Sequence, residues 1–444
     1  MSGVAVVLSI LKAPWFPIND PALFEYFGRA MVRGQRLYVD ILDTKLPGIY
    51  LVNALWQRLF GEHYFVHVLA EAAVGVATVV LFALLLRRAG VGAWAFGTCL
   101  FAWFYLVPFP QFDFSQHYAA FLLVLGLYLT FSRQNGIGGA MVALGSSFWF
   151  PGGLTCIPVL LRPVKREERV TFLAGFLWGV AFYAALMTVF WGRDIFHERA
   201  MLWQQYVQHR KIDLGQLNVT VSYSTLGPAI AAMLAWLGLV IRRPQTPAQR
   251  FALIWSGCAL IGFLIPPTFS EHYLLPSTAA LAMAIASYPF EWRLVLERQI
   301  AVLVVVVCAW FSAQRSLVTA RTYHSYAAMV QNVGTWIRGD AGSGLILYSR
   351  EYIPEIQLAA DARLVSPTGF LDYDEKMNAL ERLPQIIVWG THSWPGEVVR
   401  HETIFARTAA GSLMYYPVCV GRTGSLALYA PASIKFKDCP LSNQ

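Results

Sequence analysis

Long apolar runs separated by short polar connections dominate the chain. The first run, Val4–Phe16, is short for a membrane span of about 20 residues, but most of the later runs are long enough. These later runs predict helices near residues 64–86, 90–108, 116–132, 137–149, 153–163, 170–191, 224–241, 250–266, 273–289 and 298–314. The pattern therefore predicts a polytopic α-helical membrane protein with about eleven transmembrane helices.

Two of these expected helices, 137–149 and 153–163, are short. Pro151, Gly152 and Gly153 lie between them and predict a joining turn, so the pair would form a hairpin or one broken helix. The first run resembles a signal peptide in length, but no small-residue cleavage site follows it. We therefore interpret it as a first helix.

The connection over residues 17–63 differs from the others because it is long and rich in charge. Over residues 19–48 the acidic residues are Asp20, Glu25, Asp40 and Asp43, with Glu62 just beyond, and the basic residues are Arg29, Arg33, Arg36 and Lys45. A loop this polar lies on the membrane surface. Asp20, directly after a membrane segment, could act as a base, and Lys45, just before the Pro47-Gly48 turn, could hold an anionic headgroup. Asp20 could instead cap a helix over 22–31, because Pro21 follows it.

The last part of the chain changes character near residue 319. Leu345–Tyr348 and Gln385–Trp389 read as short buried strands, with helical stretches near 321–338, 350–360 and 372–383. We therefore expect a transmembrane domain over 1–318 and an α/β domain over 319–444.

Composition and charge support a membrane protein and argue against a nucleic-acid partner. Hydrophobic residues make up 57% of the chain and charged residues 14%, and the net charge is +8. The basic residues fall mostly between apolar runs, at Arg87, Arg88, Arg133, Arg162, Lys165, Arg166, Arg169, Arg242, Arg243, Arg250, Arg293 and Arg298. The alternate connections, around Asp113, Pro151 and Ser270, carry no Lys or Arg. This asymmetry predicts a cytoplasmic amino terminus, with the 17–63 loop and the 319–444 domain outside.

Cysteine positions add one further expectation. Cys419 and Cys439 are the cysteines outside the predicted helices. They would form a disulfide in an oxidising compartment, or they could simply stay reduced.

Two other expected external turns carry candidate site residues. Asp113 precedes Ser115, Gln116 and His117, and it reads either as a second acidic site residue or as an interfacial turn aspartate beside a helix capped by Ser115. The second turn, which opens a later helix, contains Glu271, His272 and Tyr273. The last two could donate hydrogen bonds to a phosphate or could be ordinary aromatic-belt residues.

Two weaker patterns have open alternatives. His63, His67 and Glu71 recur every four residues, which permits a metal site but also suits an interhelical hydrogen-bonded pair. The polar, aromatic segment 203–211 could be a lid that contacts sugar or a solvated connection.

The order of these motifs resembles a known family. An aspartate soon after the first helix is followed by R-G-Q-R-L-Y-V-D-I-L-D-T-K-L-P-G-I-Y and L-F-G, and later by F-D-F-S-Q-H and E-H-Y-L-L-P. This order is similar to that of the C-type (GT-C) glycosyltransferases, specifically the bacterial dolichyl-phosphate-mannose-protein mannosyltransferase-like proteins of family 39. The resemblance covers roughly residues 15–290 and is most specific over 34–48.

The resemblance implies an inverting transferase in the bacterial inner membrane. It would move a sugar from a polyprenyl-phosphate donor to an envelope lipid, polysaccharide or protein on the outer face. Asp20 matches the family's base and Asp113 its second acidic position, and Lys45 matches the lysine near the carrier phosphate. His272 and Tyr273 would also bind that phosphate. The expected substrate contacts are Asp40, Asp43, Gln116, His117 and Glu271.

The resemblance leaves the function and the cofactor open. Many relatives have a lysine where this chain has Phe150, so phosphate binding would depend more on Lys45 and His272. A lipid-linked saccharide flippase and an inactive scaffold of an envelope assembly therefore stay as alternatives. The sequence contains no glycine-rich nucleotide fingerprint and identifies no cofactor, although a divalent metal could assist.

Overall fold

The structure is a computed structural model of the chain. It describes residues 2–13, 15–18, 20–38, 40–41, 43, 45–107, 114–192, 196, 200, 204, 236–237, 240–241, 244–266, 271–288, 295–341, 346–349, 354–364, 386–390, 404–408, 411–420, 426–431 and 433–434. The chain divides into two compact units. We call them the helical unit (1–13, 44–49 and 66–321) and the sheet-bearing unit (14–43, 50–65 and 322–444).

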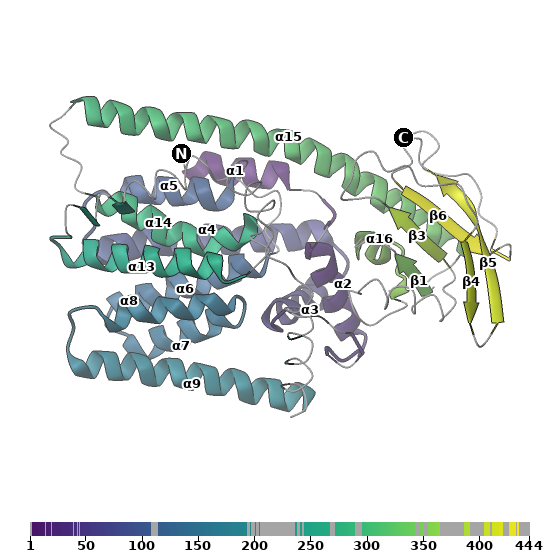
Figure 1. The fold of residues 1–444 in the computed structure, drawn as a ribbon, viewed down its shortest axis with the longest axis horizontal. Helices are drawn as coiled ribbons and strands as arrows, with labels where there is room; N and C mark the ends of the chain where they lie inside the picture. The colour runs from purple at the N-terminus through teal and green to yellow at the C-terminus, as the bar shows by residue number, and fades with distance from the viewer. Residues whose placement is uncertain are drawn as a thin grey trace. The chain divides into compact units, whose positions relative to one another are not determined.

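The helical unit contains a series of helices that run side by side (Figure 1). In chain order they are α1 (Ser2–Lys12), α4 (Tyr64–Arg88), α5 (Trp94–Leu106), α6 (Ser115–Phe131), α7 (Asn135–Ser146), η1 (Phe150–Thr155), α8 (Cys156–Leu160), α9 (Arg166–Trp191), α13 (Pro247–Leu264), η2 (Glu271–Leu274) and α14 (Leu275–Ser287). Most expected apolar helices are therefore observed. The one expected over 224–241 lies largely outside the described residues.

The turn expected at Pro151-Gly152-Gly153 is wrong. Residues Phe150–Thr155 form the 3-10 helix η1, which leads directly into α8. The chain instead turns just after α7, where the Ser147 N–H donates to the Leu144 carbonyl at 3.0 Å. Pro151 fits at the start of η1 because the first residues of a helix need no backbone N–H donor.

Small residues let the helices of this unit approach closely. A Cβ at Gly175 in α9 would overlap the backbone of Gly136 in α7, and one at Gly139 would overlap the carbonyl of Phe172. Gly179, one turn after Gly175, likewise lies against α7. This is the spacing by which membrane helices bring their backbones into contact.

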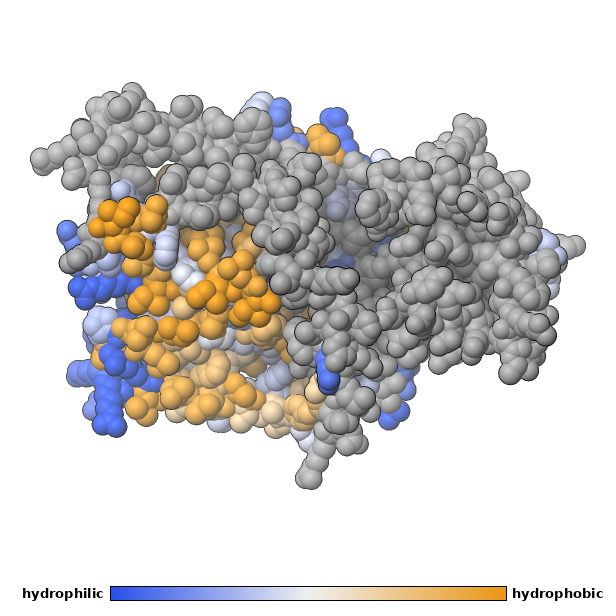
Figure 2. All heavy atoms as spheres, viewed as in Figure 1, coloured by the Kyte–Doolittle hydropathy of each residue, from blue (hydrophilic) through white to orange (hydrophobic). Residues whose placement is uncertain are grey.

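The outer surface of the helical unit is apolar. Three of the described helices, α4, α9 and α13, are long and apolar enough to cross a membrane. On α9, the side chains of Val189 and Trp178 are 81% and 64% exposed. Figure 2 shows apolar side chains gathered over this part of the molecule, with hydrophilic ones at one end. An apolar surface of this kind needs a lipid environment.

The sheet-bearing unit contains a six-stranded mixed sheet with the order β2-β1-β3-β6-β5-β4. Its strands are β1 (Ile346–Ser349), β2 (Arg363–Leu364), β3 (Ile386–Gly390), β4 (Ile404–Thr408), β5 (Gly411–Val420) and β6 (Leu426–Pro431). β1 pairs in parallel with β2 and β3, and the other pairs are antiparallel. The two strands expected from the sequence correspond to β1 and β3. Cys419 lies in β5, and the expected Cys419–Cys439 pair falls outside the described residues.

Helices from distant parts of the chain join this sheet in the same unit. They are α2 (Asp20–Val32), most of α3 (Gly48–Phe60), α16 (Pro354–Ala359) and the end of α15 (Val295–Ala341). α3 was not expected, because residues 17–63 read as a polar loop with a single helix. α16 packs against α2.

The break expected between helices 298–314 and 321–338 is also wrong. α15 is one continuous helix of 47 residues. The composition becomes more polar along it, but no Pro or Gly occurs before Gly334 to stop the backbone. A change of environment therefore does not end this helix.

Candidate active site

The first turn of α6 is the point around which the helical unit gathers predicted site residues. Ser115, Gln116 and His117 are buried there. The Tyr105 hydroxyl of α5 donates to the His117 carbonyl at 3.1 Å, and the two rings meet edge to face at 5.2 Å. Ser115 was expected to cap α6, but Phe114 is the cap residue and the Ser115 hydroxyl donates to the Gln116 side chain. The cap prediction for Ser115 is therefore wrong.

Phe114 connects this turn to η2. Its ring stacks on the His272 ring with centroids 4.9 Å apart, and His272 in turn meets the Tyr273 ring at 4.6 Å. His272 and Tyr273 are both half-buried. η2 therefore presents an imidazole and a phenol beside the start of α6. Glu271 is the first residue of η2.

The turn that carries Lys45 contacts the first turn of α6 through the side chain of Phe148. A Cβ on Gly48 would lie 3.0 Å from the Phe148 ring, so the turn rests directly on that side chain. Phe148 stacks on Tyr118, whose centroid is 5.6 Å away and which lies in the first turn of α6. Lys45 itself is half-buried just before the helix that Gly48 opens.

This arrangement suits an anion. The start of a helix carries a partial positive charge from its N–H groups, and α6 is 17 residues long. Lys45 supplies a full positive charge, and His272 and Tyr273 supply hydrogen-bond donors. We call this group, with Gln116 and His117, the α6 site.

The remaining described candidates belong to the sheet-bearing unit. Asp20 is the first residue of α2, is half-buried and is followed by Pro21. Asp20 is thus the first helical residue rather than the cap before it, and a carboxylate in this first turn interacts favourably with the helix N-terminus.

Asp40 and Asp43 have different surroundings within that unit. Asp40 is exposed and accepts hydrogen bonds from the Arg36 backbone N–H at 2.7 Å and from its guanidinium. The backbone hydrogen bond, then the side-chain one, holds the pKa of Asp40 below its ordinary value. Asp43 is buried and accepts a hydrogen bond from the buried Tyr50 hydroxyl.

A charged cluster around the buried Arg29, which the sequence did not predict, lies in the same unit. The Arg29 guanidinium lies 3.4 Å from both Glu62 and Asp361 and donates to the Leu358 carbonyl at 3.1 Å. Arg33 contacts the same two carboxylates, and its hydrogen bond with Asp361 raises the pKa of Arg33. Sequence separation hid this cluster, because Asp361 is over 300 residues away.

Asp113, the 203–211 segment and the His63–His67–Glu71 pattern are the remaining sequence predictions. Asp113 and most of the 203–211 segment lie outside the residues that the structure describes. His63 precedes α4, so it does not share a helix face with the buried His67 and Glu71. Within the described part of the chain, no three His, Cys, Asp or Glu residues form a group that could hold a metal ion.

Comparison with known proteins identifies the fold. No protein-family model matches the chain, and no curated protein matches its sequence. Among solved structures, it is similar to ArnT from Cupriavidus metallidurans bound to undecaprenyl phosphate, at TM-score 0.63 and 14% identity over 98% of both chains. The apo state of that protein gives a TM-score of 0.61 and 13% identity, also over 98% of both chains.

An archaeal protein shows the same fold at lower similarity. It is the oligosaccharyltransferase AglB from Archaeoglobus fulgidus in complex with an inhibitory peptide and a dolichol-phosphate. The TM-score is 0.54 and the identity 12%, over 88% of this chain and 69% of that one. The oligosaccharyltransferase of Archaeoglobus fulgidus with Zn and sulfate gives a TM-score of 0.54, with 12% identity over 88% of this chain and 67% of that one. The chain therefore shares the fold of ArnT and AglB, and its place among the GT-C glycosyltransferases and in the mannosyltransferase-like family stays a prediction.

Proposed function

We propose that this protein is a membrane glycosyltransferase that takes a sugar from a polyprenyl-phosphate donor. The acceptor would be an envelope lipid, polysaccharide or protein on the outer face of the bacterial inner membrane. The observation that carries the proposal is the likeness, over 98% of both chains, to ArnT bound to undecaprenyl phosphate. About eleven spans and an external position for the sheet belong to the same proposal.

The α6 site is the proposed seat of the donor phosphate. Lys45, His272 and Tyr273 would contact its oxygens, and the N–H groups that open α6 would add their partial charge. Negative charge grows on the phosphate as the sugar leaves, so these donors would stabilise the transition state more than the ground state. The chain would then need no lysine at Phe150.

Asp20 is the proposed general base. Its carboxylate would accept the proton of the acceptor hydroxyl as the oxygen attacks the anomeric carbon. The bond from that carbon to the phosphate oxygen would break on the opposite side, and the phosphate would leave with the electron pair. The anomeric configuration would therefore invert. A base in this position is worth about 10² to 10⁴ in rate.

The other candidates would bind substrate. Asp113 is proposed as the second acidic residue, and Asp40, Asp43, Gln116, His117 and Glu271 as substrate contacts. A divalent metal that assists transfer stays part of the proposal, supported by the Zn in the similar oligosaccharyltransferase structure of Archaeoglobus fulgidus.

Transfer of radiolabelled sugar from polyprenyl-phosphate donors, by full-length protein in liposomes, tests the proposal. We expect Asp20→Asn to reduce the turnover rate at least about 100-fold while the protein stays folded, because Asn has nearly the size and shape of Asp but cannot accept the proton. Glu167→Gln is the matched control, since Glu167 is an exposed carboxylate in the first turn of α9 and belongs to neither the proposed base nor the α6 site. It should keep near-normal turnover.

Changes at the α6 site should affect the donor instead. Lys45→Ala and His272→Gln should raise the KM for the donor more than they lower the melting temperature. Near-normal transfer by Asp20→Asn would contradict the role of Asp20. The wild-type protein could also fail to transfer any polyprenyl-phosphate sugar and instead move lipid-linked saccharide between leaflets. That result would overturn the transferase and identify a flippase. No transfer and no movement would leave a scaffold.

A further inference from the structure

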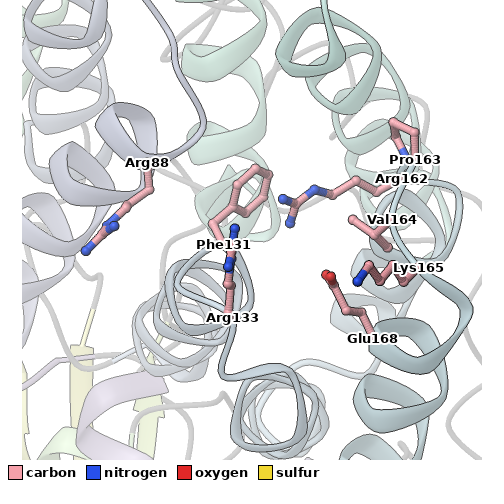
Figure 3. A pocket seen from close by; sticks show the side chains of 8 residues that line it. All are labelled: Arg88, Phe131, Arg133, Arg162, Pro163, Val164, Lys165 and Glu168. Carbon is pink, nitrogen blue, oxygen red and sulfur yellow. The ribbon is translucent and has the colours of Figure 1, made fainter.

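A basic cavity of about 820 Å³ lies in the helical unit, and the α6 site has no residue in it. Three connections that are separate in sequence line it, and the residues are Arg88, Phe131, Arg133, Arg162, Pro163, Val164, Lys165 and Glu168 (Figure 3). They lie at the ends of α4 and α6, after α8, and in the first turn of α9. We call this cavity the basic cavity. The charge asymmetry of the loops predicts that it faces the cytoplasm.

Arg162 has a fixed place in the cavity. Its guanidinium lies 4.0 Å from the centre of the Phe131 ring, and its backbone carbonyl accepts a hydrogen bond from Arg169 at 3.0 Å. Half-burial lowers the pKa of Arg162, and Glu168 opposes that shift. The guanidinium remains charged, because its ordinary pKa is far above neutral pH. In Figure 3, both Arg133 and Arg162 reach toward Phe131.

The backbone of Arg133 is unusual. Its φ angle is +68°, in the left-handed region that favours glycine, just after the end of α6. The Gln134 N–H donates to the Leu129 carbonyl at 2.9 Å, which is the pattern of a helix end normally closed by Gly. An arginine therefore stands where the fold alone would favour glycine. This suggests that its side chain has a use.

Among the residues that the structure describes, carboxylates do not balance the positive charge of the basic cavity. The lining holds four basic side chains and one carboxylate, Glu168, which points toward Lys165 in Figure 3. Arg88, Arg133 and Arg162 form no ion pair with any residue that the structure describes. Topology explains why basic residues occur in these connections, but it does not explain their meeting around one cavity.

We propose that the basic cavity binds the phosphodiester headgroup of an anionic phospholipid. Guanidinium groups match phosphate oxygens in geometry and charge. The volume is in the range of about 300 to 1,000 Å³ of binding pockets for whole small molecules, far more than one phosphate ion needs. Phe131, Pro163 and Val164 add apolar wall, as an amphiphile requires. Basic pockets between membrane helices are known to hold acidic lipid headgroups.

Native mass spectrometry of the full-length protein tests this proposal. The protein would be taken from nanodiscs of phosphatidylcholine with and without phosphatidylglycerol, and the retained lipid would be counted. We expect wild type to retain phosphatidylglycerol selectively. Arg133→Gly and Arg162→Gln should each retain about tenfold less, the effect of one charge-assisted hydrogen bond.

Arg133→Gly separates binding from folding, because glycine suits the left-handed position better than arginine. Its melting temperature should equal or exceed that of wild type. Arg166→Gln is the matched control, since Arg166 is an exposed neighbour that does not line the cavity, and it should retain lipid normally. Equal retention by wild type, Arg133→Gly and Arg162→Gln would overturn the proposal.

A second arm distinguishes lipid from soluble anions. Inorganic phosphate and glycerol 3-phosphate would be added to lipid-free protein in neutral detergent. If either raised the melting temperature of wild type but not of Arg162→Gln, and phosphatidylglycerol added nothing, the lipid assignment would be wrong. Because Asp20 and the α6 site are intact in these variants, failure here leaves the proposed transferase untouched.

Discussion

The two units of this protein are stabilised by different interactions. The helical unit has a core of apolar side chains, in which Phe82, Phe101 and Leu281 are buried, and its helices meet at glycines. Every ion pair found among the described residues lies in the sheet-bearing unit, at Arg29, Arg33, Arg36, Asp40, Glu62 and Asp361. In lipid, burial of apolar groups gives little drive between helices, so close backbone contact replaces it. Where water surrounds a domain, charged groups can help fix distant helices.

Removing the centre of the charged cluster should have the largest effect. Arg29→Met removes the buried guanidinium and leaves the Leu358 carbonyl without its donor, so we expect a loss of about 3 kcal/mol of stability. Thermal unfolding of the full-length protein and hydrogen exchange over residues 354–361 would measure it. Arg33→Met is the control, because the Arg33 side chain is 51% exposed, and it should lose about 1 kcal/mol or less. Equal effects would mean that burial does not set the strength of the cluster.

The glycine contacts of the helical unit should come next. Gly175→Ala places a Cβ against the Gly136 backbone, and α7 and α9 must separate, which we expect to cost about 1 to 3 kcal/mol. Gly136→Ala, on the other side of the interface, meets only ordinary contacts with Thr171, the nearer at 3.5 Å, and should be nearly neutral. Melting temperatures in detergent would compare them. Equal loss in both variants would contradict the role of the Gly175–Gly136 contact, since helix propensity alone favours alanine at both positions.

A buried neutral donor should matter somewhat less than a buried charge. Tyr50→Phe keeps the ring against Phe24 and Phe27 but removes the hydroxyl that donates to the Asp43 carboxylate. We expect a loss of roughly 1 to 2 kcal/mol, because Asp43 stays buried. The effect should shrink in an Asp43→Asn background. An undiminished loss there would assign the effect to packing.

The exposed ion pair should have the smallest effect, and it should depend on pH. The lowered pKa of Asp40 means that its contribution is complete above the carboxyl pKa of the unfolded chain, about 3.9, and is lost as pH falls through the lowered value. We expect at most about 0.5 kcal/mol, because Asp40 and Arg36 are exposed. The difference in melting temperature between wild type and Asp40→Asn should therefore disappear in acid. A difference that grew in acid would have the wrong sign.

The order of apolar and polar residues was enough to predict most helices of the helical unit. It also located strands β1 and β3 to within one residue at each end. It did not predict α3, because a helix of modest hydropathy inside a charged segment reads as loop. It also predicts two helices where the structure has α15 alone, because a change in polarity along the chain resembles a helix end.

The site shows the same division. The sequence by itself identified Lys45, Gln116, His117, His272 and Tyr273 as residues with suitable chemistry, and it determined the membrane class through its composition and apolar runs. Only the tertiary structure decided their neighbours: His272 stacks on Phe114 at the start of α6, and the turn that carries Lys45 rests on Phe148, which stacks on Tyr118 of α6. It also decided that Arg133 and Arg162 share a cavity and that Arg29 reaches Asp361. The reason is that hydropathy and turn chemistry act between near neighbours along the chain, whereas contacts between distant segments depend on how whole helices pack.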